Sequence, residues 1–392
     1  MPPAELSPGH PIAPVSAARL TPLRIRHVDS LRAVAACLVV WSHFAQLIGP
    51  VSGRDPAVLG FLLAVPRAWN LGRLGVIIFF AVSGFVICRS FGGPREGGAR
   101  RFLIKRFCRL YPAYWVSMLA GSLVWWASGN GFDWPLILGN ATMLPGTLGQ
   151  PILVGVYWTL EIELLFYGLC LGLYLARALD WRAVLAACVL MLAALPRLMK
   201  IVSHATGADL RLVGNRYNLV MCLAVMFWGA VFRLVYDETG GFRGGAFKKV
   251  GTWQLVLLTL ALIDVTDPNI KWVLLGRYTG PMPSYFLESS ALLIFAVWVA
   301  CLRIDNAIMT RLGVISYSLY LFHPLPMYFV PRLIGASRMI RGWGLPFWFY
   351  GAVGFAVSVA LAEGVYQCVE RPAITLGKRW AGAPRGTASR EL

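Results

Sequence analysis

Two ionisable side chains, Arg32 and His43, lie in the first long apolar segment of the chain. Their spacing of eleven residues brings them back to nearly the same face of a helix, about 16 Å apart along its axis. Ionisable groups inside a membrane are costly, so such a pair indicates a functional site. A neutral imidazole is a common general base and is less costly to bury than a carboxylate. In the alternative reading, His43 only hydrogen-bonds a neighbouring helix and holds the bundle together.

A second group of basic residues precedes the third apolar segment. Arg106 and Arg109 are three residues apart, at the end of a basic loop, and share one face where the third helix begins. Guanidinium groups match phosphate oxygens in pairs, so these two arginines predict a site for a phosphorylated cofactor at the cytoplasmic surface. The alternative is that they only set topology and contact anionic headgroups, which we favour for Arg100, Arg101 and Lys105.

Two carboxylates, Glu161 and Glu163, lie in the fourth apolar segment, within VYWTLEIELLFY. Residues two apart point about 200° apart on a helix, so at most one of them faces a shared site. That carboxylate could orient or stabilise a histidine, or pair with an arginine in the bundle.

Two further polar groups are read as structural. Ser83, followed by Gly84, lies in a bulky apolar segment, where small residues allow close helix packing, and the chain contains no GxSxG nucleophile motif. His323 and Pro324 end the ninth apolar segment, and we favour a structural role for them over the shaping of an acceptor entrance.

The elements that must position these residues are membrane helices. The chain of 392 residues is 58% hydrophobic, has a mean hydropathy of +0.64 and is only 14% charged, which predicts an integral membrane protein. Its apolar runs are continuous and do not alternate, so the predicted fold is an all-α, polytopic helix bundle and not a barrel. The ten predicted spans are 31–50, 71–92, 108–128, 157–177, 183–199, 217–236, 252–266, 286–302, 312–331 and 346–369.

The charge distribution predicts the orientation of these spans. The net charge of +18 comes from Lys and Arg clustered between apolar runs, which argues against nucleic-acid binding. Residues 89–109 contain seven basic residues and residues 129–156 contain none, so the positive-inside rule places both termini in the cytoplasm. None of the eight cysteines forms a CxxC pair, and we predict neither a metal site nor a disulfide.

The predicted domain organisation is a membrane domain between two tails. Residues 1–25 are rich in Pro, Ala and Ser, lack the apolar core of a signal peptide and predict a disordered cytoplasmic tail. Residues 26–372 form the membrane domain, and residues 373–392 form a basic cytoplasmic tail. The chain has no convincing internal repeat, which disfavours a transporter.

Six short sequences, in this order, resemble the integral-membrane acyltransferase family 3: DSLRAVAACLVVWSH, FFAVSGF, RFCRLYP, YWTLEIELLFY, SYSLYLFHP and VERP. The resemblance covers about residues 26–372. It implies ten core helices and transfer of an acyl group, usually acetyl from acetyl-CoA, to hydroxyls of envelope sugars, lipid-linked glycans or small molecules.

The resemblance also implies roles for individual residues. His43 matches the family's essential histidine and Arg32 its partner on the first helix. Arg106 and Arg109 match the RxxR motif, where cofactor binding is expected. Glu163 matches the glutamate of a W-S-L-x-x-E motif, in which this chain has Thr159 in place of serine.

Together these observations predict an O-acetyltransferase of the cytoplasmic (inner) membrane. Acetyl-CoA, or a similar acyl-CoA, would bind Arg106 and Arg109 with help from Arg32, and no metal is expected. His43 would act as the base toward a carbohydrate hydroxyl or carry the acyl group itself, with Glu163 holding the imidazole. The alternative is a transporter or flippase for an envelope glycan or small molecule, with the same residues lining its path.

Overall fold

The computed structural model describes residues 25–48, 70–131, 133–206, 217–242, 250–262, 284–329 and 347–382. Within these ranges the regular secondary structure is helical and contains no strand, which confirms the all-α prediction. Most of the predicted tail 1–25 lies outside the described residues. The main helices are α1 (Arg26–Ile48), α3 (Leu71–Ser90), α4 (Gly98–Trp125), α5 (Trp134–Ala141), α6 (Trp158–Leu175), α7 (Arg182–Thr206), α9 (Tyr217–Glu238), α10 (Val250–Ala261), α12 (Ser284–Val297), α13 (Ala307–Val314), α14 (Ser316–Phe322), α17 (Phe347–Val365) and α18 (Arg371–Trp380).

The helices have the apolar character of a membrane protein. Among the described residues, six helical segments are long and apolar enough to cross a bilayer, and two shorter apolar helices accompany them. Large apolar side chains such as Leu190 and Met191 on α7 and Leu257 on α10 are exposed at the periphery, as lipid-facing residues are. Each predicted span contains helix, but whether all ten cross the membrane remains a prediction.

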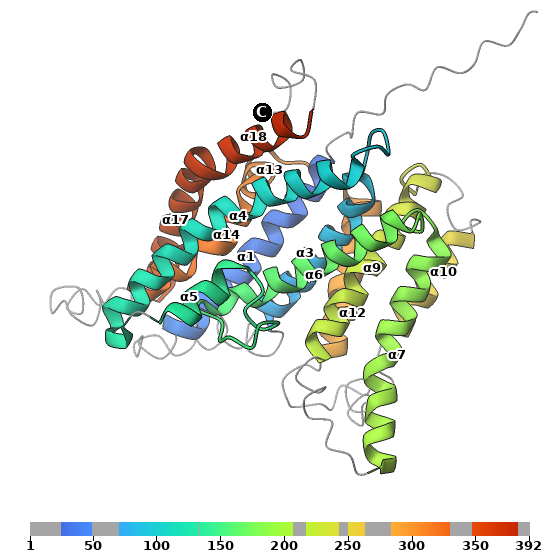
Figure 1. The fold of residues 1–392 in the computed structure, drawn as a ribbon, viewed down its shortest axis with the longest axis horizontal. Helices are drawn as coiled ribbons and strands as arrows, with labels where there is room; N and C mark the ends of the chain where they lie inside the picture. Colours follow the sequence, from blue (N-terminus) through green and yellow to red (C-terminus); the bar gives the residue numbers. More distant parts are fainter. Residues whose placement is uncertain are drawn as a thin grey trace, which may run out of the picture.

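Helices α1 and α3 lie in the middle of the bundle, with α17 and α18 along one side and α7 and α10 along the other (Figure 1). Helix α3 packs on α1, α9 and α12. Its closest approach is to α9, where a Cβ atom on Gly84 would clash with the Met226 carbonyl and one on Gly229 with the Ala81 carbonyl. Small residues thus bring two backbones together, which is the packing role predicted for Gly84.

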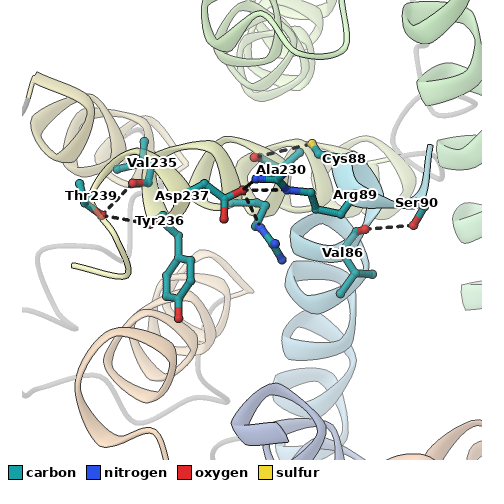
Figure 2. A network of polar contacts seen from close by, with 10 residues as sticks. Val86, Cys88, Arg89, Ser90, Ala230, Val235, Tyr236, Asp237 and Thr239 are labelled. Atoms are coloured by element: carbon teal, nitrogen blue, oxygen red, sulfur yellow. Dashed lines mark hydrogen bonds and ion pairs between the residues drawn. The ribbon is translucent and has the colours of Figure 1, made fainter. Parts of the chain in front are cut away.

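An ion-pair network joins the ends of α3 and α9. Arg89 donates two hydrogen bonds to the Asp237 carboxylate, over 3.0 and 2.7 Å, and Arg233 donates a third over 2.9 Å. Figure 2 shows Arg89 and Asp237 meeting between the two helices. Next to this network, Ser90 is the last residue of α3, and its hydroxyl donates a hydrogen bond of 3.0 Å to the Val86 carbonyl.

Helix α4 begins earlier than the sequence indicates. The third span was predicted from residue 108 after a basic loop, whereas α4 starts at Gly98, after Gly97 in the left-handed conformation (φ 67°). Arg101 folds back to donate a hydrogen bond of 2.6 Å to the Glu96 carbonyl. The prediction followed hydrophobicity, which does not register helical turns made of basic residues. Arg106 and Arg109 therefore lie in the third and fourth turns of α4.

Two local breaks shape the C-terminal half. The predicted ninth span is bent at Ile315 into α13 and α14, close to where a Cβ atom on Gly313 would clash with the Asp29 carbonyl of α1. A π-helical turn, Tyr366–Glu370, joins α17 to α18 and leaves Glu370 only 2% exposed. Such turns often occur at functional sites. Helix α18 covers the first part of the segment predicted as a C-terminal tail.

Candidate active site

His43 makes a side-chain contact with a second histidine. Its Nδ1 atom lies 2.9 Å from Nε2 of His323, which follows α14. The two ring planes are inclined by only 13°, with centroids 5.1 Å apart, so the hydrogen bond joins rings placed end to end and not face to face. His43 is half-buried and His323 is fully buried.

The side chain of Arg106 is held by two helices and two aromatic rings. It donates hydrogen bonds to the Tyr167 hydroxyl, over 2.9 Å, and to the Ser90 hydroxyl. Its guanidinium lies 4.5 Å from the centre of the Tyr167 ring and 5.6 Å from that of Phe102. These cation–π contacts and hydrogen bonds fix one guanidinium at the junction of α3, α4 and α6.

Glu163 continues this network toward the centre of the bundle. Its carboxylate accepts hydrogen bonds from the Tyr167 hydroxyl and, over 3.2 Å, from the Ser83 hydroxyl. It also lies within electrostatic range of Arg32, Arg109 and Tyr320. The sequence assigned Ser83 to packing alone, whereas the structure also gives it a hydrogen bond to the candidate carboxylate.

Glu161 points to a different place. Its carboxylate accepts hydrogen bonds from the backbone N–H groups of Gly146 and Thr147, over 3.1 and 2.6 Å, and from the Thr147 hydroxyl over 2.6 Å. The two glutamates therefore face apart, as their spacing predicts. Glu161 holds the loop that follows α5, and Glu163 faces the arginines.

Arg32 and Arg109 lie together, beside buried carboxylates. Arg32 Nη1 is 4.0 Å from the Asp29 carboxylate. Arg109 interacts electrostatically with Glu370, and among the described residues its guanidinium makes no hydrogen bond. Protein surrounds both guanidiniums, yet the Arg32 side chain keeps 18% of its surface accessible. Guanidinium N–H donors that no described residue accepts are available to an anion such as a phosphate.

Glu370 supplies a negative charge beside these cations. Its Oε2 atom accepts a hydrogen bond of 2.7 Å from Ser318, which is itself fully buried. The charges of both Arg109 and Arg32 act on the Glu370 carboxylate. The sequence alone does not predict a role for Glu370, although this residue belongs to the VERP motif. Hydrophobicity gave no signal for it, because only the π-helical turn shows that this glutamate faces inward.

The predicted site residues thus form two groups on one helix. Arg32, Arg106, Arg109 and Glu163 gather into an arginine cluster near the start of α1. His43 lies three turns further along α1 and makes its hydrogen bond to His323, not to Glu163 as expected. Tyr320 lies between the two groups: its ring packs beside that of His323, and its hydroxyl lies within electrostatic range of Glu163.

Comparisons with known proteins identify the family of this chain. Residues 25–363 match a family model described as an acyltransferase domain, that of acyltransferase family 3. Nodulation protein 10 of Rhizobium leguminosarum bv. viciae is 26% identical over 384 residues, which cover 89% of this chain and 93% of that protein. The acyltransferase MdmB of Streptomyces mycarofaciens is 25% identical over 385 residues, covering 91% of this chain and 94% of its own length.

A third relative is a proposed peptidoglycan O-acetyltransferase, YrhL of Bacillus subtilis (strain 168). It is 25% identical over 345 residues, which cover 79% of this chain and 52% of that protein. No solved structure matches the chain. Because the family model covers most of the sequence and the helices are of the membrane type, the chain belongs to acyltransferase family 3 and is a membrane acyltransferase.

Proposed function

We propose that this protein transfers an acetyl group, or a similar acyl group, from cytoplasmic acyl-CoA to a hydroxyl of an envelope sugar or polysaccharide. The observation that carries the proposal is the placement of Arg32 and His43 on one continuous helix, with Arg109 and Glu163 beside Arg32. Arg106 is linked to Glu163 through the Tyr167 hydroxyl. An anion-binding cluster and a general base then lie about 16 Å apart, a distance that the pantetheine arm of CoA is of the right order to cover.

The proposed topology places the arginine cluster at the cytoplasmic face. Ten helices cross the membrane in alternation, with α13 and α14 counted together, and both termini are cytoplasmic. Basic residues concentrated between α3 and α4 support this orientation, as does their absence from residues 129–156. CoA reaches Arg109 from the cytoplasm, and the acceptor reaches His43 from the opposite side of the inner membrane.

The three arginines contribute to acyl-CoA binding in different ways. Arg109 has no hydrogen-bond partner among the described residues and Arg32 has one loose ion pair, so both have N–H donors available for the phosphates of CoA. Arg106 already donates to Ser90 and Tyr167. It adds positive charge and holds Tyr167, and through Tyr167 it holds Glu163.

The transfer step needs one base. His43 removes the proton of the acceptor hydroxyl as its oxygen attacks the thioester carbonyl, which forms the ester C–O bond and breaks the C–S bond. The imidazolium then returns the proton to the leaving thiolate, giving free CoA. In a second route His43 attacks the thioester first and CoA leaves as its thiolate; the acceptor hydroxyl then attacks the acyl-imidazole, which forms the ester bond, breaks the C–N bond and frees His43, and the hydroxyl proton passes to the thiolate. The single-base route is the simpler of the two.

The proposal is tested by comparing envelope glycans from cells that lack the gene and cells that carry it. Mass spectrometry should show an acetyl-sized difference that wild-type protein restores and His43→Ala does not. His27→Ala is the matched control, because it removes an imidazole from the same helix, four turns away from His43. Equal membrane levels of the three proteins are checked by immunoblot.

Two outcomes would contradict the proposal. Glycan acetylation restored by His43→Ala at normal protein level would exclude the histidine as base. Net movement of a glycan across the membrane, with no acetylation and no requirement for acetyl-CoA, would instead support the transporter alternative.

A further inference from the structure

Pro324 gives His323 a backbone acceptor that an ordinary helix would not offer. In a continuing helix the carbonyl of Tyr320 would accept the N–H of residue 324, but proline has none. The Nδ1 atom of His323 takes this place, 2.8 Å from the Tyr320 oxygen. The backbone N–H of His323 meanwhile keeps its helical bond to Leu319, over 3.1 Å.

This contact determines where the His323 proton is. A carbonyl oxygen only accepts, so the nitrogen facing it must carry the proton. In the neutral imidazole the other nitrogen, Nε2, then has a lone pair and can only accept. Because His323 is fully buried and no carboxylate contacts it among the described residues, the neutral form is the one this environment favours.

The position of the proton on His323 also determines the tautomer of His43. Its Nδ1 atom faces the His323 Nε2 lone pair at 2.9 Å and must donate, so its own Nε2 is left unprotonated. We propose that His323 is a positioning residue that holds His43 as the Nδ1–H tautomer. The Nε2 atom of His43 is then the base that takes the proton of the substrate hydroxyl. This inference rests on the proposed function for its catalytic consequence, but not for the tautomer itself.

The arrangement also serves the charged intermediate of the reaction. When His43 Nε2 takes a proton, its Nδ1–H becomes a cationic donor to the His323 lone pair, and a charge-assisted hydrogen bond is stronger than a neutral one. A carboxylate commonly fills this role in hydrolases. Here Glu163 is bound to Ser83 and Tyr167, and the imidazole of His323 stands where a carboxylate would be expected.

The surroundings fix His323 in this orientation. Tyr320, whose carbonyl it binds, is anchored in turn by its hydroxyl, which contacts Thr159 over 2.9 Å and the Val156 carbonyl over 3.1 Å. The Tyr320 ring also meets Phe79 edge-on, with centroids 6.0 Å apart. The Tyr320 carbonyl that accepts the His323 hydrogen bond is therefore positioned by side chains from α3 and α6 as well as by α14.

The tautomer is measured by nitrogen NMR on protein labelled with ¹⁵N-histidine in lipid bilayers. The chain has only five histidines, so His43 and His323 can be assigned from the single variants His43→Gln and His323→Gln. We expect both to be protonated at Nδ1 near neutral pH, the less common tautomer for a free imidazole. A wild-type His43 protonated at Nε2 overturns the inference, whether or not the protein proves to transfer acetyl groups.

Activity measurements separate positioning from packing. His323→Phe fills the space but has no acceptor, and it should lower kcat by about a hundredfold, within the range for general base catalysis, with little change in KM for acetyl-CoA. His323→Gln places a carbonyl oxygen near the position of Nε2, and it should recover at least tenfold of that loss. Equal losses in both variants, with His43 still an Nδ1–H tautomer in His323→Phe, would show that His323 only packs.

Discussion

Arg106 donates a 2.9 Å hydrogen bond to the hydroxyl of Tyr167 while its guanidinium also rests 4.5 Å from the centre of the same ring. One tyrosine therefore fixes both the position and the plane of a cation on the neighbouring helix. The same hydroxyl donates to Glu163, so the phenol links the arginine to the carboxylate. Helices α4 and α6 are connected by this polar link within the bundle.

Tyr167→Phe should therefore weaken donor binding without removing the aromatic contact. A hydrogen bond to a charged group contributes about 1.5–3 kcal/mol, so we expect the Kd for acetyl-CoA to rise about tenfold. Isothermal titration calorimetry on purified protein in nanodiscs measures it without an acceptor. Tyr174→Phe, two turns further along α6, is the control and should bind normally. Unchanged binding in Tyr167→Phe would show that Arg106 needs no such support.

Arg109→Lys tests whether the guanidinium fork matters or only its charge. Lysine keeps the charge but cannot form two parallel hydrogen bonds to a phosphate, so acetyl-CoA should bind about tenfold more weakly. Arg100→Lys, an exposed position on the same helix, is the matched control and should have no effect. Equal binding by the wild type and Arg109→Lys would remove Arg109 from the proposed phosphate site.

Glu370→Ala should lower thermal stability and increase the stabilisation that acetyl-CoA provides. Removal of the carboxylate leaves the buried charges of Arg109 and Arg32 without one of their counter-charges, which is destabilising by about 3 kcal/mol. The phosphates of bound acetyl-CoA then replace part of the lost charge. The rise in Tm on adding acetyl-CoA should therefore be larger in Glu370→Ala than in the wild type. A smaller rise would place the phosphates away from Glu370.

Glu161→Gln should affect the loop after α5 and leave donor binding unchanged. The variant keeps one oxygen acceptor but loses the charge that accepts three hydrogen bonds from Gly146 and Thr147. We expect faster proteolysis of residues 142–157 and a Tm lower by a few °C. Glu163→Gln is the comparison: it removes a negative charge beside Arg32 and Arg109, so it should strengthen acetyl-CoA binding and leave the loop protected. Identical behaviour of the two variants would contradict the separation of the two carboxylates.

Much of the fold followed from hydrophobicity, because the part of a helix that crosses the bilayer must be largely apolar. The first helix and the distinct directions of Glu161 and Glu163 could be predicted from spacing alone. The start of α4 at Gly98 could not, since its first turns are basic and are helical through backbone bonds that hydropathy does not detect. The bend at Ile315 was also missed, because it depends on the close approach of α13 to Asp29.

In the candidate site, too, some relationships could be predicted from the sequence and others depend on tertiary packing. Residues on one helix, such as Arg32 and His43, can be related by periodicity. The partner of His43 could not be predicted, because His323 lies 280 residues away and only tertiary packing brings it near. The His323–Pro324 pair carried a local signal, namely a carbonyl deprived of its helical donor. That signal identifies an acceptor but not the second histidine that uses the arrangement.

Helix α1 runs from Arg26 to Ile48 without a glycine or proline, so Arg32 and His43 are separated by a stiff rod of constant length. A donor anchored by its phosphates would present its thioester at one depth whatever acyl chain it carried. Tolerance for longer chains would then depend on the room beyond His43, and engineering of donor range should start with the side chains that face that end.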